Sequence, residues 1–265
     1  MTAAFCLALG SAAAPAQAQY ATGSSDRATG ETYRVEASGF FWYPTPNIAI
    51  TSEALGIPGS RIDFVEDLGI EKSQFTQLRF TLRPGKKHKL RFEFTPVNYE
   101  ATATLRRDVI FNGITYPIAL PVATDFDWNA YRFAYEWDFV YRSRGFVGLV
   151  LEVKYTDVKA TLENVVDDQY ARARAPIPAI GIIGRGYVTP NISITGEFSG
   201  IRLPESLFED YRANYYDFDL YGTVNFNNYV GAQVGYRSFD IYYRIEEDEG
   251  ELTLKGLYFG GVVRF

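Results

Sequence analysis

Hydrophobic and polar side chains alternate along most of this chain with a period of two residues. In the clearest segment the odd positions are all aromatic: Tyr131, Phe133, Tyr135, Trp137, Phe139 and Tyr141. The even positions between them include Arg132, Glu136 and Asp138. Because successive side chains of a β-strand point to opposite faces, this alternation predicts strands with one apolar and one polar face. No segment shows a sustained helical period.

Ten segments share the alternation and predict an all-β, antiparallel up-and-down meander of about ten strands, within a range of eight to twelve. They lie near residues 33–43, 75–83, 88–105, 126–141, 146–158, 179–188, 192–202, 212–226, 229–243 and 251–265. The connections alternate in length: 84–87, 143–144, 189–191 and 227–228 are short, whereas 44–74, 106–125, 159–178, 203–211 and 241–250 are long. In such a meander every tight turn lies at one end. This asymmetry is typical of a transmembrane β-barrel with short periplasmic turns and long extracellular loops.

Period two alone does not decide which face is buried, because a soluble barrel shows the same alternation. Tyrosines ten residues apart favour a membrane barrel, since ten steps of about 3.3 Å on a tilted strand rise about 25 Å, the height of the apolar band. They predict an aromatic girdle at Tyr33, Tyr43, Tyr131 and Tyr141. The polar faces then line the lumen, with the candidates Arg79, Arg91, Glu93, Arg132, Glu136, Asp138, Glu152, Lys154, Asp217 and Asp219.

Composition and charge narrow the function. The 265 residues are 47% hydrophobic, which excludes a disordered chain. The net charge is −6, from 26 Lys and Arg against 32 Asp and Glu, and argues against a nucleic-acid partner. The chain has one His, one Cys and one Met, so it has few of the groups on which hydrolytic and metal chemistry depend. We therefore expect no catalytic residue, no cofactor and no metal site.

The first residues have the character of a cleavable signal. Residues 1–18 carry no charged side chain and contain the apolar run 3–9, and Ala16 and Ala18 supply the small residues that a signal peptidase reads. Residues 19–30 are small and polar and predict a flexible leader, followed by one barrel domain over 31–265. Cys6 lies in the signal, so the mature chain is expected to have no thiol.

The last strand carries a second targeting feature. Leu257, Phe259, Val263 and the terminal Phe265 alternate with other residues, and this pattern resembles the C-terminal assembly signal of bacterial outer-membrane β-barrel proteins. The resemblance implies insertion by the barrel-assembly machinery with periplasmic chaperones, and an outer membrane of lipid and lipopolysaccharide as surroundings. It covers nearly the whole mature chain but indicates no functional subfamily, and it leaves the oligomeric state open.

Some small outer-membrane barrels are enzymes, and the resemblance raises the omptin proteases and the lipid A deacylase, palmitoyltransferase and phospholipase types. For these it implies a His near or above the outer leaflet, paired with Ser or Asp. The only His here is His88, in a predicted periplasmic turn at the opposite end of the barrel. Asp217 and Asp219 share one strand face, but inward acids opposite Arg132, Lys154 and Arg185 are more typical of a structural salt network. An enzyme acting on lipid or peptide is therefore the least favoured interpretation.

The long connections carry further signals. Asn112-Gly113 predicts a two-residue hairpin within 106–125. The stretch 62–69 mixes apolar and acidic residues and either folds into the barrel mouth or adds a strand pair. Acidic runs at 167–168 and 246–249 are solvated loop charge or a place for divalent cations shared with lipopolysaccharide. Pro176 and Pro178 predict that the next membrane strand begins after them.

Three functions fit this architecture. The first is a non-enzymatic barrel with a narrow charged lumen and a structural or surface-display role, because about ten strands leave little space inside. The second is a porin-like diffusion channel for small solutes, in which the inward charges line a wet path. In the third, the loops 44–74 and 106–125 bind a partner at the cell surface.

Overall fold

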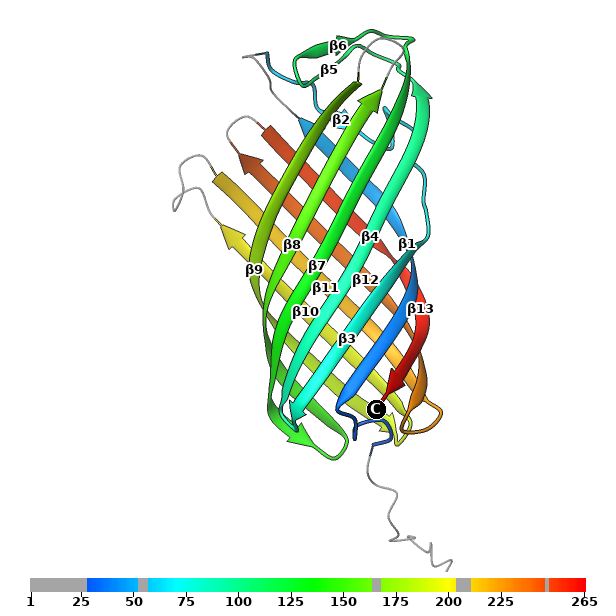
Figure 1. The fold of residues 1–265 in the computed structure, drawn as a ribbon, viewed down its shortest axis with the longest axis vertical. Helices are drawn as coiled ribbons and strands as arrows, with labels where there is room; N and C mark the ends of the chain where they lie inside the picture. The colour runs from blue at the N-terminus through cyan, green and yellow to red at the C-terminus, as the bar shows by residue number, and fades with distance from the viewer. Residues whose placement is uncertain (1–27, 52–56, 164–167, 204–210, 246–247) are drawn as a thin grey trace, which may run out of the picture.

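The computed structural model describes residues 28–51, 57–163, 168–203, 211–245 and 248–265. In these residues ten long antiparallel strands close into a barrel (Figure 1). They are β1 (Val35–Thr51), β3 (Phe75–Gly85), β4 (His88–Thr104), β7 (Pro121–Arg142), β8 (Gly145–Glu163), β9 (Asp168–Thr189), β10 (Ile192–Leu203), β11 (Tyr211–Asn225), β12 (Val230–Ile245) and β13 (Asp248–Arg264). Within the described ranges no helix is long and apolar enough to span a membrane.

Each long strand pairs with the next along the chain, and β13 returns to pair with β1. The closing seam extends over the whole of β1, from Glu36 opposite Arg264 to Thr51 opposite Glu249, and glycines 39 and 261 face each other within it. Closure leaves no free edge along this seam, which is how β-barrels satisfy backbone groups inside a membrane. The predicted ten-stranded up-and-down barrel is confirmed.

The tight turns lie at the lower end in Figure 1, where the C-terminus also lies. Between paired strands the turns are residues 86–87, 143–144, 190–191 and 226–229. The long connections gather at the opposite end. By the asymmetry of membrane barrels, the tight-turn end faces the periplasm and the other end faces outward.

Several strands are longer than the sequence predicts. Residues 44–51, expected in a loop, continue β1, and β9 begins at Asp168 rather than after its prolines. β4, β7, β8 and β9 form a tall wall on one side of the barrel, whereas β10 to β13 end lower (Figure 1).

Pro176 and Pro178 therefore lie inside a strand, contrary to expectation. On one side they pair with Tyr155 and Val153 of β8. On the other side β10 pairs with β9 only as far as Ile180, so within the described ranges no strand pairs with the segment that holds the prolines there. Proline is accepted at a strand edge because its missing N–H removes no ladder hydrogen bond. The prediction was wrong because it assumed that every strand is paired on both sides along its full length.

Two short elements close the outer end. β5 (Val109–Phe111) and β6 (Ile114–Tyr116) form the predicted hairpin, in which Asn112 and Gly113 have φ values of 48° and 78°. Positive φ at both central residues matches a type I′ turn, the geometry that Asn-Gly favours. β2 (Ile62–Asp63) adds a brief pairing to β1, and the residues after it fold into the barrel mouth. The 62–69 stretch thus adds a short strand pairing and also folds into the barrel mouth, the two alternatives that the sequence left open.

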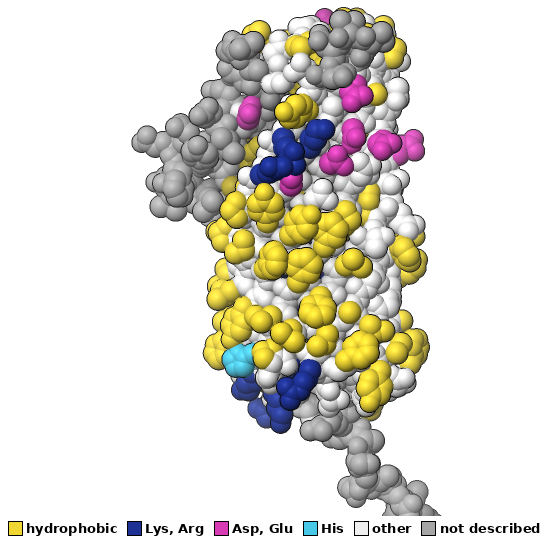
Figure 2. Space-filling view, viewed as in Figure 1, with side chains coloured by type: hydrophobic (Ala, Val, Ile, Leu, Met, Phe, Trp, Pro, Cys, Tyr) yellow, Lys and Arg dark blue, Asp and Glu magenta, His cyan; other side chains and the backbone are white. Residues whose placement is uncertain are grey.

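Apolar side chains cover the outside of the barrel in a broad band (Figure 2). Phe133, Leu151 and Ile180 are 56%, 55% and 59% exposed, and many other aliphatic and aromatic side chains on the same face are comparably exposed. Soluble monomers rarely expose such a continuous apolar surface, so this face contacts lipid. Charged side chains gather beyond both edges of the band.

The predicted girdle is wrong at two positions. Tyr43 is 43% exposed and Tyr131 is half-buried, but Tyr33 is only 6% exposed and lies inside the tight-turn end. The backbone N–H groups of Arg34 and Val35 both donate to the carbonyl oxygen of Phe265. This irregularity interrupts the alternation just before β1, so the odd position 33 no longer faces outward. Tyr141 packs against the buried side chain of Phe146, and its ring centroid lies 5.3 Å from Cζ of Arg83, because a bulge in β7 after Trp137 reverses the direction of the residues that follow.

Candidate functional site: the barrel interior

The periplasmic half of the interior is filled with charged side chains. All ten candidate lumen residues lie there: eight are buried, and Arg79 and Arg91 have side chains 10% and 12% exposed. The structure adds inward charges that the candidate set omitted, among them Lys89, Glu197 and Arg237, and it buries Arg185, which the sequence analysis places opposite the inward acids. Strand parity would have identified Lys89, Glu197 and Arg237, because each lies an even number of residues from a candidate or from another inward residue of its strand.

Arg132 links several carboxylates of this network. Its guanidinium donates to the carboxylates of Glu152 and Glu197, and its Nη1 lies 3.9 Å from Oε2 of Glu93. The Glu152 carboxylate also accepts the Ser199 hydroxyl at 2.8 Å. One arginine thus joins carboxylates from three other strands, which fixes the strands relative to one another.

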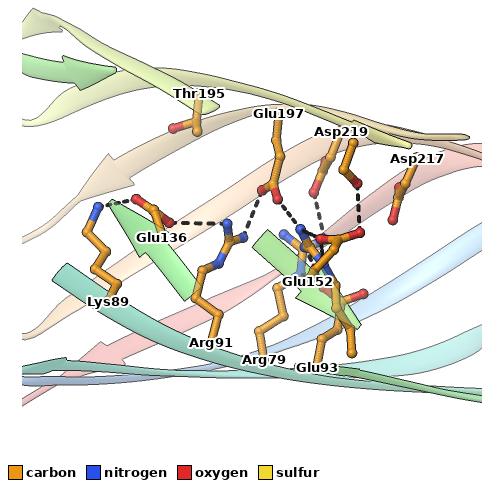
Figure 3. Close-up of polar contacts among 12 residues, drawn as sticks. Arg79, Lys89, Arg91, Glu93, Glu136, Glu152, Thr195, Glu197, Asp217 and Asp219 are labelled. Carbon is orange, nitrogen blue, oxygen red and sulfur yellow. Dashed lines mark hydrogen bonds and ion pairs between the residues drawn. The ribbon is translucent and has the colours of Figure 1, made fainter. Parts of the chain in front are cut away.

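A second part of the network extends toward the periplasm. Nζ of Lys89 contacts the carboxylates of Glu136 and Asp138, the latter at 3.0 Å. The Arg91 guanidinium bridges Glu136 at 3.2 Å and Glu197 at 2.8 Å (Figure 3). The ion pairs therefore form a continuous chain from Lys89 to Arg132.

A third part crosses to the opposite wall. Arg237 binds Asp217 with Nε–Oδ1 at 2.9 Å and Nη2–Oδ2 at 2.5 Å, and its Nη1 also contacts Glu93. Lys154 donates to the same Asp217 at 2.8 Å. Arg79 contacts Asp219 at 2.7 Å. Every candidate lumen residue thus has an oppositely charged partner.

Very little open space is left among these side chains. The cavity inside the network has a volume of about 30 Å³ and is lined by residues that include Arg79, Lys89, Arg91, Glu136 and Arg185. A water molecule needs a cavity of at least about 10–15 Å³, so this one holds one or two. Paired charges rather than solvent therefore occupy this half of the lumen.

The outer half of the interior is apolar. Ile62, Phe64, Leu68 and Ile70, all from the first long connection, are 0–2% exposed. They pack with buried side chains of the tall wall; the Phe64 and Phe126 rings meet edge to face with centroids 5.5 Å apart. Burying these four large apolar side chains stabilises the folded position of the segment in the mouth, by about 1.5–3 kcal/mol for each side chain.

The β5–β6 hairpin holds that segment in place. The backbone N–H of Ser60 donates to the carbonyl of Ile110 at 2.9 Å, and the N–H of Ile110 donates to the Ser60 hydroxyl at 3.0 Å. The Arg107 guanidinium donates to the Asp67 carboxylate and to the Arg61 carbonyl, both at 2.6 Å. We call residues 57–74 together with β5 and β6 the outer cap.

A third closure crosses the periplasmic end. The backbone N–H groups of Ala28, Thr29 and Gly30 donate to Ser143, Pro190 and Asn228, at 3.3, 2.7 and 3.0 Å. These three partners belong to three different tight turns. We call residues 28–33 the strap. The expectation of a flexible leader through residue 30 is wrong for 28–30, which are hydrogen-bonded across the barrel; residues 1–27, with the predicted signal, lie outside the described residues.

Glu31 anchors the strap to the barrel. Its Oε1 accepts hydrogen bonds from Arg185 Nη1 and the Tyr187 hydroxyl, both at 2.9 Å. Burial raises the pKa of Glu31, but the charges of Arg185 and Lys89 and these two hydrogen bonds outweigh it and lower the pKa below its ordinary value. The carboxylate is therefore ionised at neutral pH and holds the strap by a charge-assisted contact.

The single histidine lies outside this interior. His88 begins β4 at the tight-turn end and is exposed, with Nδ1 2.6 Å from the Tyr135 hydroxyl. Among the described residues no group of three or more His, Cys, Asp or Glu side chains is arranged to hold a metal ion. Of the acidic loop runs, residues 167 and 246–247 lie outside the described residues.

Comparison with solved structures places this geometry in a known class. The outer membrane protease OmpT of Escherichia coli aligns over 87% of this chain and 96% of its own, at 10% identity and a TM-score of 0.59. The chain has the fold of an outer-membrane β-barrel. With its apolar band, this fold places the protein in the bacterial outer membrane. At 10% identity the likeness to OmpT is one of fold alone.

Two further barrels align less well. Ail of Yersinia pestis matches 87% of this chain and 98% of its own at 9% identity and a TM-score of 0.37. The toluene transporter TodX of Pseudomonas putida matches 88% and 90% at 6% identity and a TM-score of 0.36. At these TM-scores the two alignments indicate nothing about the function of this chain. No protein-family model matches the sequence, and no match was found among curated proteins.

The assembly-signal candidates all lie on the lipid-facing side of β13 and at its end. Leu257, Phe259, Val263 and Phe265 are 63%, 51%, 42% and 75% exposed. Their recognition by an assembly machinery stays a prediction.

Proposed function

We propose that this protein is a sealed, non-enzymatic outer-membrane barrel that supports the membrane and presents its outer cap at the cell surface. The observation that carries the proposal is the filling of the interior at three levels. The strap crosses the periplasmic opening, the ion-pair network occupies the inner half, and the apolar cap residues occupy the outer half. A solute would have to displace all three to cross.

The charges inside argue for support rather than transport. A solute path needs inward charges that remain hydrated and available to the solute. Here the carboxylates of Glu93, Glu197 and Asp217 each contact two or more cations. A buried charge in such a network is stable only with its partners in place, so conformations that open a wet path are costly.

The proposal that the protein is not an enzyme rests on the available chemistry. OmpT is a protease by its name, so a barrel of this fold can be an enzyme. The one His of this sequence lies at the opposite end, so it cannot act as a general base at the outer mouth. The outer mouth itself is filled by apolar side chains of the cap.

Uptake of small solutes by liposomes tests the proposal. Vesicles containing the folded barrel are expected to exclude arabinose and glycine as well as vesicles without protein do. Folding is checked by the shift in gel mobility on heating. Uptake that rises with the amount of folded protein would contradict the proposal and favour the small-solute channel. Hydrolysis of peptides or of outer-leaflet lipids by the folded barrel would contradict its non-enzymatic part.

A further inference from the structure

A cavity of about 710 Å³ opens at the periplasmic end, beside the strap. Three segments form its walls: residues 31–34, which are the end of the strap and the residue before β1, residues 83–86 at the end of β3 and in the turn after it, and residues 141–143 at the β7–β8 turn. It is separate from the sealed lumen, and neither the barrel's support role nor its cap accounts for it.

The cavity is strongly cationic. Arg34, Arg83, Lys86 and Arg142 line it, and Glu31 is the one carboxylate among its lining residues. Glu31 is already engaged by Arg185, as described above, and its Oε2 also lies 3.5 Å from Nη1 of Arg83. Arg34, Lys86 and Arg142 are exposed, so their charges are available to a ligand. Clustered Arg and Lys side chains of this kind favour phosphate and carboxylate groups.

Arg83 gives this cavity a rigid base. Its Cζ lies 5.3 Å from the ring centroid of Tyr33 and 5.3 Å from that of Tyr141, so two aromatic rings flank the guanidinium. Nη1 donates to the Glu31 carbonyl at 2.5 Å and Nη2 to the Lys86 carbonyl at 2.9 Å. Nε is buried and has no hydrogen-bond partner among the described residues. A fixed guanidinium with an unused donor loses little entropy when it binds an anion.

The position of the cavity relative to the apolar band indicates the source of the anion. On β7 the outward side chains of Phe139 and Val140, each 40% exposed, end the band two residues before Arg142. On β3 the last exposed apolar side chain, Leu82, lies four residues before Lys86. The cationic side chains therefore lie just beyond the apolar band, at the level of the phosphate headgroups of the periplasmic leaflet.

We propose that this cavity binds the phosphate headgroup of an anionic phospholipid of the periplasmic leaflet. The exposed cations Arg34, Lys86 and Arg142 attract the headgroup, and the guanidinium of Arg83 adds positive charge at the base of the cavity. The same site links the strap to the surrounding lipid, because Glu31 and Tyr33 belong to both.

Native mass spectrometry of the full barrel in a neutral maltoside detergent tests this proposal, with phosphatidylglycerol and inorganic phosphate titrated separately. The test variant is Arg34→Gln/Lys86→Gln/Arg142→Gln. The matched control, Arg106→Gln/Arg202→Gln/Arg244→Gln, removes three exposed cations at the outer end. All six side chains are exposed, so both variants are expected to fold, which heat-modifiable gel mobility verifies.

We expect one phosphatidylglycerol per barrel, bound about 100-fold more weakly by the test variant, since each cation near an anionic lipid contributes about fivefold. The control variant is expected to bind like the wild type. Equal lipid affinity in the two variants would overturn the site. Saturable binding of inorganic phosphate without retention of phosphatidylglycerol would overturn the assignment to lipid.

Discussion

At the scale of single residues, the stability of the filled interior depends on how the inward charges are paired. Arg132 serves as the shared partner of Glu152 and Glu197 and lies near Glu93. Its side chain is only 6% exposed, so removing it would leave the Glu152 carboxylate without a cation and would take one of several partners from Glu93 and Glu197, in a space that excludes water. Such uncompensated buried charge is among the few single changes that destabilise a folded protein severely.

We therefore expect Arg132→Met to lower the free energy of unfolding by about 3–5 kcal/mol. The matched control is Arg172→Met, because Arg172 pairs with Asp157 at 2.7 Å on the exposed outer face of the wall. Exposed ion pairs contribute about 0–1 kcal/mol, so this control should change stability little. Equilibrium unfolding of the folded barrel in lipid vesicles by guanidinium chloride measures both. Equal, small losses would mean that the network is hydrated rather than buried.

Much of this interior could be predicted one residue at a time. Strand parity identifies Glu136, Asp138, Lys154 and the other candidates as inward-facing, because each apolar face had to meet lipid. The partner of each charge could not be predicted. Pairings such as Arg91 with Glu197 join residues 106 positions apart, and they depend on the stagger of the strands around the barrel. Tyr33 shows the limit of parity itself, since one backbone irregularity reversed its direction.

At the scale of elements, the outer cap is a small apolar core built on a barrel wall. Phe64 and Leu68 are fully buried in it, whereas Val65 in the same segment is 39% exposed. The sequence indicated a large mixed loop at this position but not its packing, because the apolar residues of 57–74 have no period that reports a partner surface. The sequence analysis missed the strap for a similar reason. Thr29 and Gly30 are held by backbone hydrogen bonds, and the identity of a small polar residue does not predict such bonds.

We expect Phe64→Ala/Leu68→Ala to release the cap without unfolding the barrel. Large-to-small changes at buried Phe and Leu cost about 2–5 kcal/mol each, whereas each hydrogen bond from the segment to the hairpin contributes only about 0.5–1.5 kcal/mol. Trypsin should then cleave faster after Arg61 and Arg107 than in the wild type, while the heat-modifiable mobility of the barrel is retained. Val65→Ala in the same segment is the control and should leave cleavage unchanged. Loss of the folded barrel itself in the double variant would show that the cap is part of the barrel's core.

At the scale of the whole molecule, polar and apolar side chains occupy different levels along the barrel axis. An apolar band meets lipid, and cationic side chains lie beyond it on the tight-turn side (Figure 2). The interior changes from ion pairs to apolar packing between the two ends. The sequence predicts the band, the strand number and the turn asymmetry, because these depend on local alternation and spacing. The sequence does not predict that the lumen is sealed, because sealing depends on which side chains meet across the lumen of the folded barrel.

Single-channel conductance in planar bilayers tests the sealing most directly. The wild-type barrel, with folding verified by its gel mobility, is expected to insert without opening ohmic steps. The Phe64→Ala/Leu68→Ala variant is also expected to be silent, because the ion-pair network and the strap still fill the periplasmic half. Stable ohmic steps from the wild-type protein, scaling with salt concentration, would contradict the account and make this barrel a small-solute channel.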